Sequence, residues 1–373
     1  MRRARWKAHE GAVRCLAISR DEATLASGGD DGAAKLWAYP GGAPARELAG
    51  PPARGAEGAP GLDDQNPVLA AAFSAGGEMA HFITHAGEAT AYLVASGELA
   101  WRAPPIERLG GKVGIAAVAS DRGLVALGRH TSLARRSLTG AADESILLYS
   151  LDERRVIGEL SWSAQVGRGL DRITHSIGFT PDGSTLALAG LEAAFDIDGD
   201  WLGYTSYAAV FQTDPVTEKG ILYLDSDHAP PWGVRRAIAI HPSGTHIGLA
   251  GTSEVRGVEH TYTLGDREVV AAAQLKPPGH YEDGFGGNDR DEPFRHLGTL
   301  DAEPTAIAFS PDGSLLAMAD AAGAAVASWT EGASGYLDAL GCDAGVTSVL
   351  FSPTGRSLIY GRADGTIEIV RIP

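Results

Sequence analysis

Three aspartates at alternate positions are the clearest metal-ligand pattern in this sequence. Asp196, Asp198 and Asp200 lie around a glycine in the stretch FDIDGDW. Calcium takes several oxygen ligands from one turn, so this spacing fits the first part of a calcium-binding loop. The glutamate that closes such a loop at its twelfth position is replaced here by Tyr207. We therefore interpret the stretch as a solvated acidic loop and keep an ion site as the weaker alternative.

The histidines do not form a recognisable catalytic or metal-binding pattern. His81 and His85 are four residues apart, and His241 and His246 flank a turn, but neither pair has a third ligand nearby in sequence. The sequence contains no nucleophile elbow, phosphate-binding loop, dinucleotide-binding glycine motif or zinc-protease motif. These observations predict a protein that is not an enzyme and that carries no cofactor.

Several aromatic and basic residues are candidates for binding a protein partner. Arg135 and Arg136 form a compact positive spot that could meet an acidic partner, although a solvated pair is the simpler interpretation. Tyr281 and Phe285 lie in the acidic stretch HYEDGFGGNDRDE, which is either a recognition segment or a flexible linker. The predicted set is completed by two aromatic residues that follow the aspartates, Trp201 and Tyr204.

The elements that must position these residues are short strands in a repeated unit. An apolar strand, a turn rich in Ser, Pro, Asp and Gly, and a second apolar strand recur seven times. The copies span residues 16–28, 69–84, 114–128, 175–190, 236–251, 305–320 and 347–362. Four of the turns contain a proline at the same place, Pro181, Pro242, Pro311 and Pro353. Proline presets the backbone for such turns, so their common phase supports a true repeat.

A third strand follows each pair and usually ends on a bulky residue, and a fourth run follows most of them. This pattern predicts an all-β, seven-bladed β-propeller of four-stranded antiparallel blades in a single domain, residues 1–373. The predicted blades span residues 10–50, 67–103, 112–160, 173–224, 235–275, 304–340 and 345–373. The last copy has only three strands, so we expect residues 2–8 to supply its outer strand and close the ring.

The first copy closely resembles one WD40 repeat. The family's motif positions are occupied by His9, Ser27, Asp31 and Trp37. The resemblance implies that these four side chains form a hydrogen-bonded row that holds the blade together. In the other copies the motif is incomplete: Cys342 falls where His9 falls, and Val370 falls where Trp37 falls. We therefore expect apolar packing to hold most of the blades.

Composition and charge exclude several classes of protein. The chain has 373 residues, a formal net charge of −16 and 44% hydrophobic residues, which suits a folded domain. An acidic chain repels phosphate backbones, so no nucleic-acid binding is expected. No apolar run could span a bilayer and the N-terminus lacks an apolar signal region, so we expect no membrane contact and a cytoplasmic protein. The two cysteines are interpreted as reduced thiols.

The long insertions between strands are all expected on one face of the disc. They are residues 50–66, 129–144, 191–206, 252–258 and 277–296. The second-to-third strand connections and the links between blades emerge on the same face of an antiparallel blade. By resemblance to WD40 proteins this is the face that binds partners, and long loops on a rigid scaffold commonly carry binding.

The sequence therefore predicts a non-catalytic protein–protein interaction scaffold that binds partners of unknown identity through this face. Its Ala/Gly-rich repeats resemble bacterial WD40 proteins, which often act as subunits of multi-protein assemblies. Two alternatives remain open. A propeller enzyme of the metal-dependent hydrolase or lactonase type would hold an ion at the central channel. A small-molecule or peptide sensor would be stabilised against heat by its ligand.

Overall fold

The computed structural model describes most of the chain, and every structural statement below refers to this part. The described residues are 3–48, 66–109, 113–128, 146–160, 172–180, 182–195, 201–214, 216–223, 235–252, 268–274, 294–300, 304–320, 323–330, 333–339 and 345–372. Their regular structure is β-strand apart from two short 3-10 helices, η2 (Glu107–Leu109) and η3 (Ser120–Arg122). No helix in these ranges is long and apolar enough to cross a membrane.

The strands follow one another in groups of four. The first three groups are β2 (Val13–Ile18), β3 (Thr24–Gly29), β4 (Ala34–Ala38) and β5 (Ala43–Leu48); β6 (Val68–Phe73), β7 (Met79–Thr84), β8 (Ala89–Leu93) and β9 (Leu99–Ala103); and β10 (Ile115–Ala119), β11 (Leu124–Gly128), β12 (Ile146–Ser150) and β13 (Arg155–Leu160). The fourth and fifth are β14 (Arg172–Phe179), β15 (Thr185–Phe195), β16 (Trp201–Thr213) and β17 (Val216–Tyr223); and β18 (Arg235–Ile240), β19 (His246–Thr252), β20 (Glu268–Gln274) and β21 (Phe294–Leu300). The last two are β22 (Pro304–Phe309), β23 (Leu315–Asp320), β24 (Ala324–Thr330) and β25 (Ala333–Ala339); and β26 (Val346–Phe351), β27 (Ser357–Arg362) and β28 (Thr366–Arg371), which pair with β1 (Arg3–Lys7).

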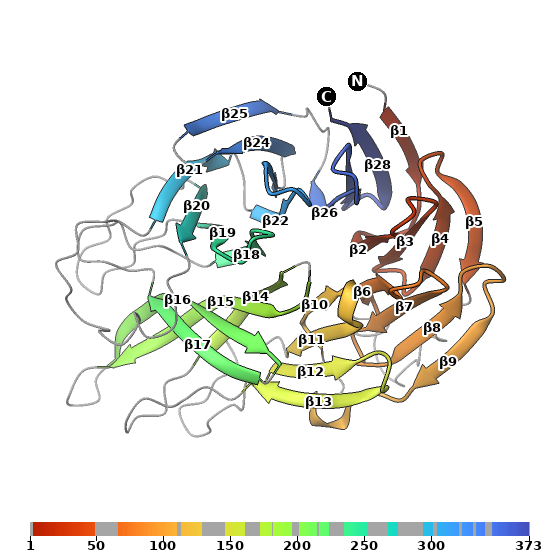
Figure 1. Cartoon of the computed structure of the whole chain (residues 1–373), viewed down its shortest axis with the longest axis horizontal. Coiled ribbons are helices and arrows are strands. Elements are labelled where there is room, and N and C mark those ends of the chain that lie inside the picture. The colour runs from red at the N-terminus through yellow and green to blue at the C-terminus, as the bar shows by residue number, and fades with distance from the viewer. Residues whose placement is uncertain are drawn as a thin grey trace.

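The strands of the described residues form seven four-stranded antiparallel sheets arranged around a central axis (Figure 1). The first strand of each group is innermost, and each innermost strand contacts those of the two neighbouring sheets. This is an all-β propeller, as the repeats predict, and each sheet is one blade. We call the face where first-to-second and third-to-fourth connections emerge the lower face, and the opposite one the upper face.

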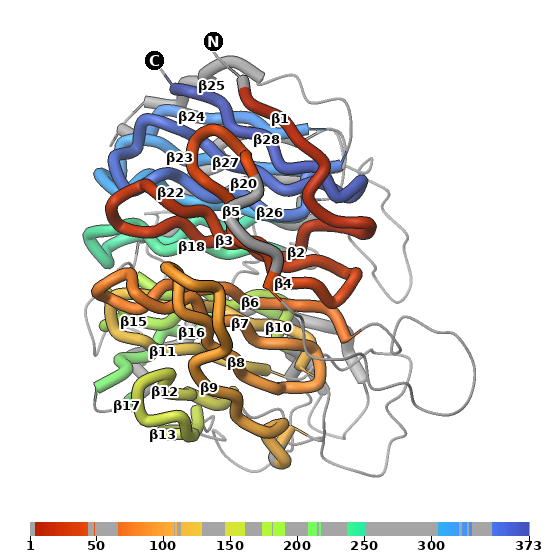
Figure 2. Tube along the Cα trace, turned by 90° about the vertical axis from the view of Figure 1, so that its right-hand side faces the viewer, coloured from red at the N-terminus to blue at the C-terminus, as the bar shows by residue number. Residues whose placement is uncertain are grey.

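The N-terminal strand closes the ring. β1 pairs antiparallel with β28, from Arg3 opposite Val370 to Lys7 opposite Thr366, so both termini lie in the seventh sheet (Figure 2). Trp6 packs against the apolar cluster shared with the first blade, and its ring centroid lies 5.7 Å from that of Trp37. The closure predicted from the incomplete last repeat is therefore confirmed.

The core is divided into seven apolar clusters, one at each seam between neighbouring blades. Because side chains point alternately to the two faces of a strand, each strand contributes residues to two clusters. Leu25 of β3 faces blade seven, and Ala26 faces blade two. Small residues such as Ala80 and Ala91 let the blades approach closely. Apolar contact between neighbours is therefore the main force that holds the ring together.

Blade five differs from the sequence prediction. The predicted blade ends at residue 275, but its third strand is β20 and its fourth strand is β21, which lies beyond that boundary and includes His296. The insertion at residues 277–296 therefore joins the third and fourth strands of one blade and does not link two blades. Its ends lie at the lower face, so the prediction that all long insertions share one face is wrong for this segment.

Blade four also differs, because most of its insertion is sheet. Residues 191–206 were expected as a loop, but β15 continues to Phe195 and β16 begins at Trp201. The two strands pair throughout, from Thr185 opposite Gln212 to Phe195 opposite Trp201. A continuous run of residues able to form cross-strand pairs explains the extension, which turn-based repeat counting could not detect.

Candidate functional site

The upper end of blade four carries a projecting β-hairpin that contains two of the predicted binding residues. Pairing of β15 with β14 ends at Arg172 opposite Glu192, and pairing of β16 with β17 ends at Tyr207 opposite Tyr223. Residues 193–195 and 201–206 therefore pair only with each other within the described chain (Figure 1). We call residues 191–195 and 201–206 the blade-four hairpin.

The strand register gives the blade-four hairpin two unlike faces. Ala187 and Ala189 of β15, and Ala208 and Val210 of β16, face the seam with blade five. Continuing the register, with a bulge opposite Phe195, gives two alternating sets of positions on the hairpin strands. The first set, in phase with these four residues, is Leu191, Ala193, Phe195, Trp201, Tyr204 and Ser206. The second set is Glu192, Ala194, Gly203 and Thr205. The first set contains the aromatic residue types and is called the aromatic face below, whereas the second contains only small or polar types.

The other predicted binding residues lie outside the described residues: Arg135, Arg136, Tyr281 and Phe285. The three aspartates of the weaker ion-site alternative do so too: Asp196, Asp198 and Asp200. Among the described residues, no group of three or more His, Cys, Asp or Glu side chains could hold a metal ion. Of the predicted candidates, the register brings Trp201 and Tyr204 together on the blade-four hairpin.

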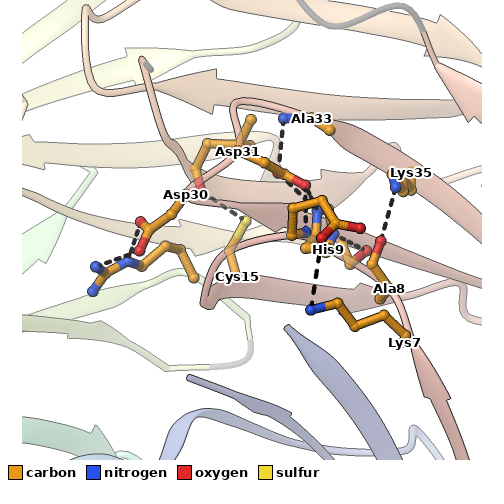
Figure 3. Close-up of polar contacts among 12 residues, drawn as sticks. Lys7, Ala8, His9, Cys15, Asp30, Asp31, Ala33 and Lys35 are labelled. Atoms are coloured by element: carbon orange, nitrogen blue, oxygen red, sulfur yellow. Dashed lines mark hydrogen bonds and ion pairs between the residues drawn. The ribbon is translucent and has the colours of Figure 1, made fainter. Parts of the chain in front are cut away.

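The four motif residues of blade one form a continuous hydrogen-bonded row, of which Figure 3 shows His9 beside Asp31. The Trp37 Nε1–H donates to Ser27 Oγ at 2.8 Å, and Ser27 Oγ lies 2.8 Å from His9 Nε2. His9 Nδ1 lies 3.0 Å from an Asp31 carboxylate oxygen. Because the carboxylate only accepts, His9 donates from Nδ1 and accepts the Ser27 hydroxyl proton at Nε2. Every polar atom of the buried His9 ring is therefore satisfied.

Asp31 is held as a carboxylate by this environment. Burial alone would raise its pKa, but hydrogen bonds from His9 and from the Glu10 and Ala33 N–H groups outweigh that effect and lower the pKa to about 2. The hydrogen bonds favour the charged form because they stabilise it directly. Asp31 therefore stays ionised through the ordinary pH range and keeps the row in one tautomer.

Other blades replace the row by apolar side chains. The strand registers place Phe82, Leu127, Leu188, Leu249, Met318 and Tyr360 at the position of Ser27. In blade two the Phe82 and Tyr92 rings meet edge to face at 6.1 Å, where blade one has Ser27 and Trp37. Packing thus takes over from hydrogen bonding, as the incomplete motifs predict. In blade six the strand register places Ala327 at the position of Trp37.

The histidines of the lower face lie in aromatic surroundings. The His241 ring lies within 6.1 Å of the rings of His246, Phe309 and Trp329, across the seam between blades five and six. The Ser243 N–H donates to His241 Nδ1, and His241 Nε2 lies 3.2 Å from the Gly313 carbonyl oxygen. His241 therefore carries its proton on Nε2 and joins the turns of two blades.

Sequence reasoning missed a buried histidine between blades two and three. His81 is only 2% exposed, and its Nδ1 has no hydrogen-bond partner within the described part of the chain. Its ring lies 5.6 Å from that of Trp101, and the Arg154 guanidinium lies over the Trp101 ring at 5.1 Å from its centroid. Burial lowers the pKa of His81 to about 4, with Asp152 opposing and Arg154 adding to the shift. The sequence feature that indicates burial of His81 is its position in the apolar pattern of β7.

Acid should therefore weaken the fold through His81. The unfolded chain binds the proton near the ordinary pKa of 6.5, whereas the folded chain does not until about pH 4. Stability is complete above pH 6.5 and falls as the pH drops to 4, by about 2–3 kcal/mol. Urea unfolding of wild type and His81→Leu at both pH values measures this. We expect His81→Leu to lose less stability over this window, and an equal loss in both proteins would contradict the assignment.

Comparison with known proteins agrees with the fold. The sequence model for the WD domain, G-beta repeat, matches residues 2–38 and 337–370, which are the blades on either side of the ring closure. No curated protein sequence matches the chain. Among solved structures, Kuenenia stuttgartiensis hydrazine synthase superimposes with a TM-score of 0.69 at 11% sequence identity, over 98% of this chain and 97% of that chain. At that identity the likeness concerns the fold alone.

Proposed function

We propose that this chain, a propeller with WD40 repeats at both of its ends, is a non-catalytic protein-interaction scaffold and a subunit of a multi-protein assembly. It binds a partner protein through its upper face, and the aromatic face of the blade-four hairpin is the anchor. WD40 propellers commonly serve as interaction scaffolds, which supports this class of function. The observation that carries the proposal is the unlike character of the two hairpin faces.

The blade-four hairpin suits this role physically. Its base is fixed by four-stranded pairing, while its outer part pairs only within itself, so it presents residues beyond the body of the blade. Tyr and Trp supply large contact areas at low cost in conformational entropy, and they dominate the energy of many interfaces. Phe195, Trp201 and Tyr204 share one face, so a partner could cover all three at once.

The upper face also offers the ends of most of the long connections. The strands on either side of residues 49–67, 129–145, 161–171, 224–234 and 253–267 all end there. Connections between rigid strands are common places for recognition residues. The strand ends beside these connections thus share the upper face with the blade-four hairpin.

Capture from native lysate with matched variants tests the proposal. The test variant is Trp201→Ser/Tyr204→Ser, which changes the aromatic face. The control is Glu192→Ala/Thr205→Ala, which changes the opposite face of the same hairpin. We expect wild type and control to retain a stoichiometric partner and the test variant to lose it at least about tenfold, since each aromatic anchor contributes on the order of 1–2 kcal/mol.

Equal capture by both variants, with both folded, would exclude the blade-four hairpin as the anchor. The absence of any stoichiometric protein partner of the wild-type chain would contradict the scaffold function itself. Folding of each variant is checked by its unfolding midpoint in urea, because Trp201 and Tyr204 lie in a paired strand.

A further inference from the structure

We infer that the hydrogen-bonded row of blade one is the clasp of the ring, coupling the closing strand β1 to blade one so that the two open together. In the described part of the chain, β1 is joined to β28 by antiparallel strand pairing. The segment that leaves β1, Ala8 to Ala12, crosses from blade seven to blade one. The residues that hold this segment determine whether the closing strand is fixed at both ends.

Blade seven holds the segment through its upper turn. The backbone N–H groups of Ala8 and His9 both donate to the Gly365 carbonyl oxygen at 2.9 Å. Lys7 Nζ donates to the Asp364 carbonyl oxygen at 2.8 Å. The approach is so close that a Cβ on Gly365 would lie 1.9 Å from the His9 carbonyl oxygen. The segment is therefore pressed against the turn between β27 and β28.

Blade one holds the same segment from the other side. Lys35 Nζ donates to the Ala8 carbonyl oxygen at 2.8 Å, and the Glu10 N–H donates to Asp31 at 3.0 Å. The His9 side chain enters the blade and joins the row described above. His9 thus bonds blade seven with its backbone and blade one with its ring. A change inside blade one can therefore reach the closing strand through His9, together with the neighbouring bonds of Ala8 and Glu10.

Further bonds cross the same seam below the clasp. Thr347 Oγ1 donates to the Val13 carbonyl oxygen at 2.6 Å, which joins the innermost strands of blades seven and one. At the lower face the Thr354 N–H donates to Glu22 Oε1 at 2.8 Å. Glu22 adopts a left-handed conformation, φ 53°, where five other lower turns have glycine. These bonds hold the inner strands of blades seven and one together even when the outer strand β1 detaches. We therefore expect the opening to be confined to β1 and the strands next to it.

Hydrogen exchange of Ser27→Ala tests the clasp. This change removes the hydroxyl that links Trp37 to His9 without touching Trp6, which packs on β1. Ser310→Ala is the control, because Ser310 is equally buried in a turn of blade six, away from the seam. We expect amide exchange in β1 and β28 to accelerate about fivefold in Ser27→Ala, the effect of losing about one hydrogen bond, and to be unchanged in Ser310→Ala.

Faster exchange confined to β2, β3 and β4 would overturn the inference, because the row would then stabilise blade one alone. An equal acceleration in all blades would also overturn it, since the row would then contribute only to global stability. If Ser27→Ala does not fold, Ser27→Cys provides the second measurement, because it keeps a small side chain away from Trp6 and weakens both hydrogen bonds of the Ser27 hydroxyl. The same pattern in β1 and β28 is expected there.

Discussion

Replacing Gly365 by alanine is expected to lower the free energy of unfolding by about 4 kcal/mol, close to the largest cost of a single substitution. Two effects combine at this position. The backbone is left-handed, φ 79°, which alone costs an L-residue about 1–2 kcal/mol. The added Cβ would also meet the His9 carbonyl oxygen at 1.9 Å, and backbone cannot move aside as a flexible side chain can. Urea unfolding measures the loss.

Gly77→Ala separates the two effects. Gly77 has nearly the same backbone conformation, φ 78°, but no atom lies within 4 Å of its added Cβ. We expect this control to cost only about 1 kcal/mol, the conformational part alone. Equal losses in the two variants would show that the close approach between the upper turn of blade seven and His9 does not matter to stability.

Replacing Arg362 by methionine is expected to cost about 3–5 kcal/mol, the usual effect of removing one partner from a buried ion pair. The Arg362 side chain is 1% exposed, and its NH1 lies 3.5 Å from the Glu368 carboxylate, which is 5% exposed. A second carboxylate, Asp364, lies 3.9 Å from its Nε. Methionine keeps most of the volume, so the loss reports the carboxylate left in the core without its arginine.

The double variant Arg362→Met/Glu368→Met provides the check. Replacing both partners by apolar side chains of similar volume leaves no buried charge, so we expect it to recover most of the lost stability. The measurement is the urea midpoint of wild type, single and double variants. A double variant that is as unstable as the single one would show that packing, not charge, sets the cost.

The ring architecture could be predicted because it depends on local patterns that recur. Alternating apolar strands and turns such as that around Asp312 fix each pair of inner strands, and the missing fourth strand of the last repeat required β1. Blade five was misassigned because strand alternation does not distinguish a third strand from a fourth. Only pairing with its neighbours, β19 on one side and β21 on the other, identifies β20. Such long-range pairing leaves no local mark in the sequence.

The candidate site was predictable only in part, for the same reason. Trp201 and Tyr204 stand out by residue type, but their common face depends on the bulge opposite Phe195, which a sequence does not reveal. The sequence does not predict His81 as a metal ligand, because no third ligand lies near it and His85 in sequence. Its actual surroundings come from blade three, through Asp152 and Arg154, which lie about seventy residues away in sequence.

Photo-crosslinking from the two faces of the blade-four hairpin tests the central claim most directly. A photoreactive amino acid is placed at position 204 in one protein and at position 205 in another, and both are irradiated in native lysate. Adjacent positions on one strand face opposite sides, so the two probes differ little except in the face they report. We expect one specific protein adduct from position 204 and little from position 205. Adducts of equal yield from both positions, or none from position 204, would contradict partner binding through the aromatic face.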